Sequence, residues 1–122
     1  MAPCRVLIVD DCPELRRLIC RILGARRYSI VEAESADQAL SRIRGTPQRF
    51  DLVISDVVMP GTDGYALAVQ LREQVGAMIL MSGYPMDPDR LPPGVAFVSK
   101  PFTTQQLRDS VARALGPVAI PR

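Results

Sequence analysis

The chain has 122 residues, of which 48% are hydrophobic, and this length predicts one domain with a single core and no second effector domain. Its 15 basic and 13 acidic side chains give a net charge of +2, and because the basic residues are scattered we expect no nucleic-acid partner. No apolar stretch reaches the roughly 20 residues of a membrane helix and the N-terminus lacks a signal-peptide pattern, so we expect no membrane insertion and a cytoplasmic location.

The first predicted strand, Arg5–Val9, is followed by a helix at Pro13–Leu23, which begins with a favourable proline and ends before Gly24. Apolar residues recur along this helix every three or four positions and predict a buried stripe of Leu15, Leu18, Ile19, Ile22 and Leu23. The opposite face is expected to meet water and carries Glu14, Arg16, Arg17 and Arg21. Together with Arg26 and Arg27, these arginines fit either an ordinary solvated face or a docking surface for an acidic partner.

The middle of the chain continues the alternation of strand and helix. A strand at Ser29–Ala33 precedes a helix through Arg44, where Ser35 and Gln38 have the spacing of a capping box. A strand at Leu52–Ser55 then leads into residues 56–64, whose proline and glycines predict a loop, and into a helix at Tyr65–Glu73.

The last part of the chain holds strands at Ala77–Met81 and Ala96–Val98 and a final helix at Thr103–Leu115, which also begins with the capping-box spacing. Prolines at positions 85, 88, 92 and 93 lie between these two strands, and their density excludes a long regular helix. We therefore expect a short or irregular fourth helix there, and a flexible tail at residues 117–122.

Alternating strands and helices predict an α/β fold, a doubly wound five-stranded parallel sheet of flavodoxin-like type with strand order 2-1-3-4-5. Ligands of such sheets bind beyond the carboxyl ends of the strands, where the first and third strands are neighbours. Asp10 and Asp11 follow the first strand and Asp56 follows the third, so we expect these carboxylates to converge. Ser82 follows the fourth strand and Lys100 follows the fifth.

Converging carboxylates repel one another: two unit charges about 5 Å apart cost roughly 3 kcal/mol at an effective dielectric constant of about 20. Such a cluster is expected either to raise a carboxylate pKa or to recruit a cation. The chain has no histidine, and oxygen donors favour a hard ion, Mg²⁺ before Mn²⁺ or Ca²⁺. A carboxylate, a metal, the Lys100 ammonium and the Ser82 hydroxyl are the groups that hold a phosphoryl group, so these residues indicate phosphoryl transfer to an aspartate.

Several short segments carry a resemblance to a known family: Val9-Asp10-Asp11, Asp56 with the following Met59-Pro60 and Asp63-Gly64, Met81-Ser82-Gly83, and Phe97-Val98-Ser99-Lys100-Pro101-Phe102. In their joint order they resemble a response-regulator receiver domain of two-component signalling, the family of the chemotaxis response regulator. The resemblance covers the chain from Val6 to Leu115, which puts the receiver domain at residues 1–116. Residues 81–85 are similar to receivers attached to hybrid sensor histidine kinases, so the chain fits either a stand-alone regulator or such a receiver.

The resemblance implies that Asp56 accepts a phosphoryl group from a phosphohistidine on a separate protein, a sensor histidine kinase or a histidine phosphotransfer protein. It implies that Mg²⁺ is bound by Asp11, Asp56 and the backbone carbonyl of Val58, with Asp10 acting through a metal-bound water. Such a domain phosphorylates and dephosphorylates only itself, so we do not expect an enzyme with an outside substrate.

The resemblance also implies how the signal leaves the domain. Ser82 would hydrogen-bond the new phosphoryl group and let Phe97 turn from exposed to buried, which changes a surface that a downstream effector protein reads. Lys100 would pair with the aspartate and then with the phosphate, and its peptide bond to Pro101 is cis in the family.

Two other functions remain open on the sequence. An Mg²⁺-dependent aspartyl-phosphate phosphatase also uses Asp pairs after a strand, but it needs a second Asp two residues after the nucleophile. This chain has Val58 at that distance from Asp56 and Cys12 at that distance from Asp10. A phosphate-independent pseudo-receiver scaffold would bind a partner through its fold alone and would not need this cluster of charges.

Overall fold

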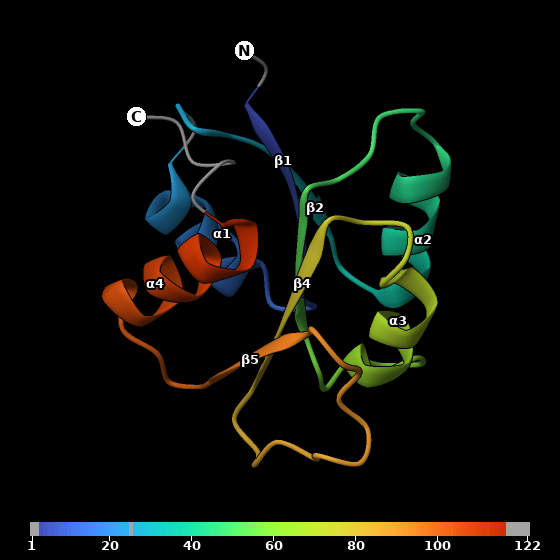
Figure 1. Ribbon diagram of the computed structural model, residues 1–122, viewed down its shortest axis with the longest axis vertical. Coiled ribbons are helices and arrows are strands. Elements are labelled where there is room, and N and C mark those ends of the chain that lie inside the picture. Colours follow the sequence, from blue (N-terminus) through green and yellow to red (C-terminus); the bar gives the residue numbers. More distant parts are fainter. Residues whose placement is uncertain (1–2, 25, 117–122) are drawn as a thin grey trace.

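The computed structural model describes residues 3–24 and 26–116, in which strands and helices alternate. The strands are β1 (Cys4–Val9), β2 (Tyr28–Ala33), β3 (Leu52–Asp56), β4 (Ala77–Ser82) and β5 (Ala96–Ser99). The helices are α1 (Pro13–Leu23), α2 (Ala36–Arg44), α3 (Gly64–Leu71) and α4 (Thr104–Leu115) (Figure 1). Each strand and helix that was predicted with bounds is therefore present, with ends that differ from the prediction by at most two residues, whereas the short or irregular helix expected between β4 and β5 is absent from the described residues there.

The strands form one parallel sheet in the order β2-β1-β3-β4-β5, which confirms the predicted fold class and strand order. In the register of the sheet Val9 lies opposite Ser55, and Ser82 lies opposite Ser99. Because parallel strands in this register end side by side, the residues that follow them collect at one edge of the sheet.

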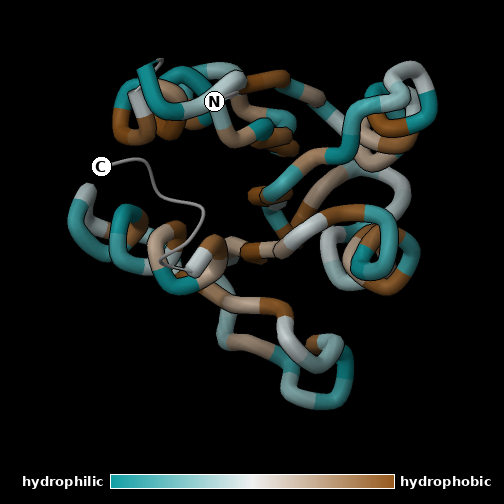
Figure 2. Tube along the Cα trace, turned by 45° about the horizontal axis from the view of Figure 1, so that its top comes forward, coloured by the Kyte–Doolittle hydropathy of each residue, from teal (hydrophilic) through white to brown (hydrophobic). Residues whose placement is uncertain are grey.

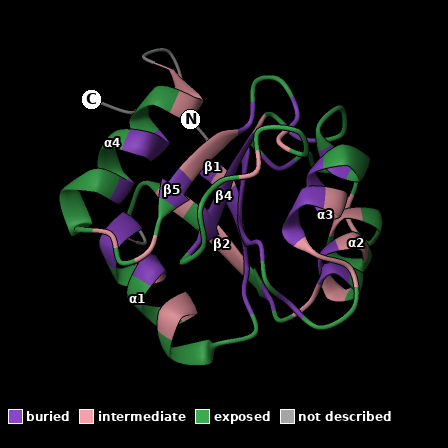
Figure 3. Ribbon diagram, turned by 90° about the horizontal axis from the view of Figure 1, so that it is seen from below, coloured by how far each residue is buried: buried purple, intermediate pink, exposed green. Residues whose placement is uncertain are grey.

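Helices cover both faces of the sheet, α1 and α4 on one face and α2 and α3 on the other (Figure 1). Alternate side chains of β1 point to opposite faces, so that Leu7 and Val9 belong to one core cluster whereas Val6 and Ile8 belong to the other. Figure 3 shows the buried strands enclosed between the helices, and Figure 2 shows hydrophobic stretches along the trace in the middle of the molecule. Burial on both faces explains why the strands read as continuous apolar runs rather than as alternating ones.

The two predicted capping boxes differ in the structure. At α4, Thr103 Oγ1 accepts from the Gln106 amide at 3.0 Å and Gln106 Oε1 accepts from the Thr103 amide at 2.8 Å, which completes the box. At α2, Ser35 Oγ accepts from the Gln38 amide at 3.1 Å, but Gln38 Oε1 accepts from the amide of Glu34. The second helix therefore has the serine cap that was predicted and a glutamine contact shifted by one residue.

Two predictions for α1 are wrong. Leu18 is 40% exposed, whereas Ile19 is 0% and Ile22 8% exposed, so the buried stripe is narrower than predicted. Arg16 was expected to face water, but its side chain is 15% exposed and forms an ion pair with Glu32 at 2.9 Å. The periodicity argument placed Arg16 in solvent because its side chain is charged. It could not foresee that Glu32, on the neighbouring strand β2, provides a partner.

The connection between β4 and β5, residues 83–95, contains neither a helix nor a strand. It holds two hydrogen-bonded turns: the amides of Arg90 and Leu91 donate to the Asp87 carbonyl at 3.2 and 3.1 Å, and the amide of Val95 donates to the Pro92 carbonyl at 3.2 Å. This agrees with the irregular connection that its prolines predict. The segment extends from the sheet at the lower edge of Figure 1.

Contacts with the start of α3 anchor this segment. The Arg90 guanidinium binds both carboxylate oxygens of Asp63, at 2.7 and 3.1 Å, and lies 4.9 Å from the centre of the Tyr65 ring. The Tyr65 hydroxyl accepts from the amide of Asp87 at 2.8 Å. Burial on its own raises the pKa of Asp63, but the hydrogen bonds from Arg90 and from a helix amide outweigh burial and hold that pKa below its ordinary value.

Within residues 3–24 and 26–116, no helix combines the length and the apolar character that crossing a bilayer requires. The tail predicted at residues 117–122 lies outside the described residues.

Candidate functional site

Three carboxylates lie together where β1 and β3 end. Asp10 is 1% exposed and Asp56 is 7% exposed, whereas Asp11 is open to solvent. One carboxylate oxygen from each residue lies within 4.8 Å of the others. The structure thus brings together Asp10, Asp11 and Asp56, which we call the acid cluster.

The sheet itself sets the positions of residues at this edge. The amide of Val57 donates to the Met81 carbonyl at 2.9 Å, and the amide of Lys100 donates to the Ser82 carbonyl at 2.8 Å. Backbone hydrogen bonds therefore continue past the ends of β3 and β5. Asp56 and Lys100 consequently sit on rigid strand ends rather than on loop tips.

Lys100 reaches the acid cluster from the β5 side. Its Nζ atom lies 3.1 Å from Asp56 Oδ1 and 3.4 Å from Asp10 Oδ2. Burial on its own lowers the pKa of Lys100, but the two carboxylates together outweigh burial and raise that pKa above its ordinary value. The side chain is therefore an ammonium that bridges two of the three acids.

Asp10 is the most deeply buried of the three acids. Burial is the main cause that raises the pKa of its carboxyl group, and the negative charge of Asp56 adds to this effect. A hydrogen bond from the Cys12 amide, 2.8 Å from Asp10 Oδ1, and the charge of Lys100 act in the opposite direction but do not cancel the increase. Lys100 and the Cys12 amide therefore compensate only part of the cost of burying this carboxylate.

The donor set of the acid cluster suits a hard divalent cation. Carboxylate oxygens are the ligands that Mg²⁺ and Mn²⁺ prefer. Because hard cations bind oxygen at about 2.0–2.6 Å, oxygens that lie within 4.8 Å of one another are close enough to share one ion. An ion there would also add positive charge beside Asp10, whose carboxylate Lys100 compensates only in part. The residues present therefore fit a cation of the Mg²⁺ class.

The remaining predicted site residues belong to β4, β5 and the loops that follow β3 and β5. Ser82 ends β4 and is 2% exposed, whereas Val58 lies in the loop after Asp56 and is 55% exposed. Phe97 is half-buried on β5 and packs against the core cluster that contains Leu7. The peptide bond before Pro101 is cis. The roles of these residues toward a phosphoryl group remain predictions.

Comparison with protein families matches residues 6–112 to the response regulator receiver domain. This range includes the acid cluster, Ser82 and Lys100. The chain belongs to the receiver domain family. It is therefore a signal-transduction domain of the kind found in two-component systems.

Relatives of this receiver domain include a response regulator and a sensor kinase. The response regulator GtcR of Aneurinibacillus migulanus is 37% identical over 102 residues, which make up 80% of this chain and 41% of that protein. The sensor kinase CckA of Brucella abortus (strain 2308) is 36% identical over 116 residues, 90% of this chain and 12% of that protein. The receiver domain thus spans less than half the length of these curated relatives.

A solved structure shows the same fold. The crystal structure of the receiver domain from the hybrid histidine kinase CckA is similar with a TM-score of 0.78 and 34% sequence identity. The match covers 92% of this chain and 99% of that chain. The likeness therefore extends over nearly the whole of both domains.

Sequence reasoning missed two contacts of the site. The Arg16 Nη1 atom donates to the backbone oxygen of Asp10 at 2.6 Å. The amide of Cys12 donates to the side chain of the same residue at 2.8 Å. Neither contact has a sequence signal of its own, because one uses a backbone carbonyl and the other a backbone amide. A weak hint was the place of Arg16 one helical turn after the loop that carries Asp11.

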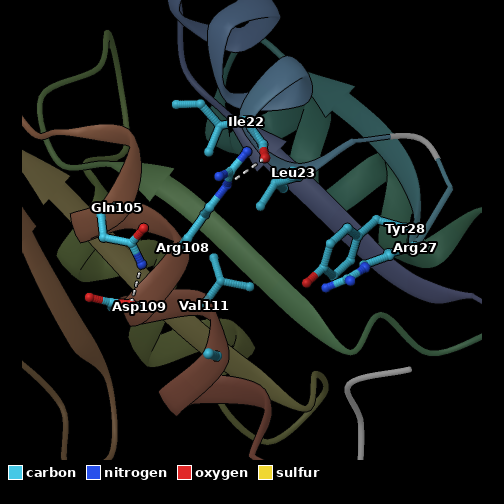
Figure 4. Close-up of a pocket in the computed structure, with 9 residues that line it drawn as sticks. Ile22, Leu23, Arg27, Tyr28, Gln105, Arg108, Asp109 and Val111 are labelled. Carbon is cyan, nitrogen blue, oxygen red and sulfur yellow. Dashed lines mark hydrogen bonds between the residues drawn. The ribbon is translucent and has the colours of Figure 1, made fainter. Parts of the chain in front are cut away.

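A separate pocket of about 500 Å³ lies between α1 and α4, with none of the acid cluster in its lining (Figure 4). Its polar groups bind one another: Gln105 Nε2 donates to Asp109 Oδ1 at 2.7 Å, and Arg108 Nε donates to the Ile22 carbonyl at 3.4 Å. This pocket is therefore separate from the acid cluster.

Proposed function

We propose that this receiver domain accepts a phosphoryl group on Asp56 from the phosphohistidine of a sensor histidine kinase or a histidine phosphotransfer protein. The observation that carries the proposal is the surroundings of Asp56. Its carboxylate is 3.1 Å from the Lys100 ammonium and shares the acid cluster with Asp10 and Asp11, with oxygens within 4.8 Å. A domain that only bound partners through its fold would gain nothing from close carboxylates that repel one another.

In the transfer, a carboxylate oxygen of Asp56 attacks the phosphorus of the donor. The new O–P bond of an acyl phosphate forms as the P–N bond breaks, and the electron pair of that bond stays on the imidazole nitrogen. The Lys100 ammonium, paired with Asp56 beforehand, then pairs with the phosphoryl oxygens. Asp10, Asp11, Asp56 and the Val58 carbonyl would hold Mg²⁺, or Mn²⁺ in its place, and such an ion would neutralise charge on the phosphoryl group.

Ser82 and Phe97 convert the modification into a change of surface. Ser82 Oγ accepts from the amide of Tyr84 at 3.0 Å, so its own hydroxyl hydrogen can be donated to a phosphoryl oxygen. Contacts of the acyl phosphate with Ser82 and Lys100 favour one conformer over the other, which is a shift of population. Phe97, half-buried in this structure, turns further inward in the favoured conformer, and a downstream effector protein reads the altered surface.

The scope of the activity follows from the same site. We propose that the domain, residues 1–116, catalyses only its own phosphorylation and the hydrolysis of its own acyl phosphate, in the cytoplasm and without an outside substrate. The similarity to the CckA receiver, at 34% identity over 92% of this chain, supports the receiver of a hybrid kinase as one setting. The similarity to the response regulator GtcR, of which the chain spans 41%, supports the receiver of a response regulator as a second setting.

Acetyl phosphate with Mg²⁺ tests the assignment of Asp56. We expect the wild-type chain to gain one phosphate by intact-mass spectrometry, and we expect Asp56→Asn to gain none. Asp89→Asn is the matched control, because Asp89 is an exposed acid of the segment after β4 and lies outside the acid cluster. An Asp56→Asn chain that still gains the phosphate mass at another residue contradicts the assignment.

A further inference from the structure

The side chain of Arg16 joins the ends of two strands beside the acid cluster. Its Nη1 atom donates to the backbone oxygen of Asp10 at 2.6 Å, and its Nε atom donates to Glu32 Oε1 at 2.9 Å. The side chain is 15% exposed, so it lies against the protein rather than in solvent. Arg16 therefore links the residue after β1 to a residue of β2.

The oxygen that Arg16 binds belongs to the peptide unit between Asp10 and Asp11. A peptide unit is planar, so the direction of its oxygen also sets where the following nitrogen and Cα lie. A hydrogen bond to this oxygen thus restrains the Cα atoms of both aspartates at once. These are the two residues that contribute the β1 side of the acid cluster.

Three other contacts hold Asp10 at different atoms. Its amide donates to the Ala33 carbonyl at 3.1 Å, its Oδ1 atom accepts from the Cys12 amide at 2.8 Å, and its Oδ2 atom accepts from Lys100 at 3.4 Å. None of these contacts involves the carbonyl that precedes Asp11. Arg16 supplies the contact that carries the restraint on to Asp11.

We propose that Arg16, anchored by Glu32, is a positioning residue that holds the Asp10–Asp11 peptide unit so that both carboxylates face one divalent cation. The inference rests on the proposed function, because the cation serves the transfer to Asp56, and it adds a residue from outside the acid cluster. Lysine cannot take this role, because one ammonium lacks the planar fork whose separate donors reach a carbonyl and a carboxylate together.

Arg16→Lys keeps the positive charge and loses the fork, so it separates positioning from simple charge attraction. We expect the dissociation constant for Mg²⁺, titrated alone and followed by amide NMR shifts, to rise about tenfold, as is typical for a changed outer-shell partner of a metal ligand. Glu32→Gln loosens the anchor without touching Arg16 and should shift the constant in the same direction by less. Arg17→Lys changes the exposed neighbouring arginine and should leave the constant unchanged.

A second measurement needs no metal. The amide of Cys12 is hydrogen-bonded to Asp10, so its hydrogen exchange in Mg²⁺-free buffer reports the order of this loop. We expect faster exchange of this amide in Arg16→Lys than in the wild type. If Arg16 only supported the fold, the variant would unfold at lower urea concentration and bind Mg²⁺ as tightly as the wild type, and this result would overturn the inference.

The wild-type chain separates the two proposals. If it binds Mg²⁺ and gains phosphate on Asp56 while Arg16→Lys binds Mg²⁺ equally well, the positioning role is wrong and the proposed function stands. If the wild-type chain does not bind Mg²⁺ at all, the proposed function fails and the inference fails with it.

Discussion

At the scale of single residues, the surroundings of Asp10 disfavour the ionised form of its carboxyl group. Its carboxyl is buried and faces the negative charge of Asp56. Lys100 and a backbone amide offset only part of the resulting rise in its pKa. A group of this kind destabilises the folded chain when it is ionised, because the folded state binds its proton more tightly than the unfolded state does. Because the negative charge of the acid cluster is only partly compensated, binding of a cation there is favourable.

Asp10→Asn removes this penalty, and the amide oxygen that replaces Asp10 Oδ1 can still accept from Cys12. In Mg²⁺-free buffer at pH 7 we therefore expect the variant to have a higher free energy of unfolding than the wild type in urea titrations. The pKa of Asp10 is raised in the folded state, so its penalty applies above that pKa and disappears as the pH falls through it toward the unfolded value. The difference between the two chains should shrink on acidification, and a constant or growing difference contradicts the assignment.

At the scale of elements, the start of α3 is packed against the backbone that carries Asp56. A Cβ atom added at Gly64 would lie 2.4 Å from the Asp56 carbonyl oxygen and 2.8 Å from Val57 Cα. The Gly64 amide donates to the Val57 carbonyl at 2.8 Å, which holds the two segments at this distance. The Asp-Gly pair at 63 and 64 therefore has a packing reason: Asp63 caps the helix, and Gly64 lets it approach β3.

Gly64→Ala should therefore push α3 away from β3. We expect the free energy of unfolding to fall by about 1–3 kcal/mol, the usual cost of overpacking, measured by urea unfolding. Gly83→Ala is the matched control, because a Cβ atom there meets nothing within 4 Å. Equal stability of the two variants would mean that the approach of α3 to β3 is not tight.

At the scale of the whole molecule, the acid cluster joins β1 to β3 and so connects sequence positions far apart. A cation that binds only the folded chain raises its stability by mass action, by about 2.7 kcal/mol when the free ion is at 100 times its dissociation constant. Cation binding at the acid cluster and the stability of the fold are therefore linked, so that a measurement of one tests the other.

Thermal unfolding with and without Mg²⁺ checks this linkage. We expect the wild-type melting temperature to rise with Mg²⁺ concentration, and we expect Asp11→Asn to lose most of that rise. Because Asp11 is exposed, the melting temperature of the Asp11→Asn variant without Mg²⁺ should stay close to that of the wild type. Asp89→Asn should keep the full response, and an Asp11→Asn chain that also keeps it rules out Asp11 as a ligand.

The sequence by itself determined the strands, the helices and the edge of the sheet where the acid cluster collects. Four of the apolar runs stop at a charged or polar residue, and a parallel sheet places the residues after its strands side by side whatever the loops between them do. The Asp10, Asp56 and Lys100 positions were therefore predictable. Prolines between β4 and β5 likewise excluded a regular helix without any knowledge of packing.

Only the tertiary structure decided which way individual polar side chains turn. Leu18 and Arg16 occupy helix positions whose periodicity predicts the opposite exposure, and Asp63 meets Arg90 across 27 sequence positions. Such contacts arise where two separately formed elements dock, and their partners include backbone atoms that every residue carries. A one-dimensional pattern records the type of each side chain but not these partners, so the residues that position the site appear only once the chain has folded.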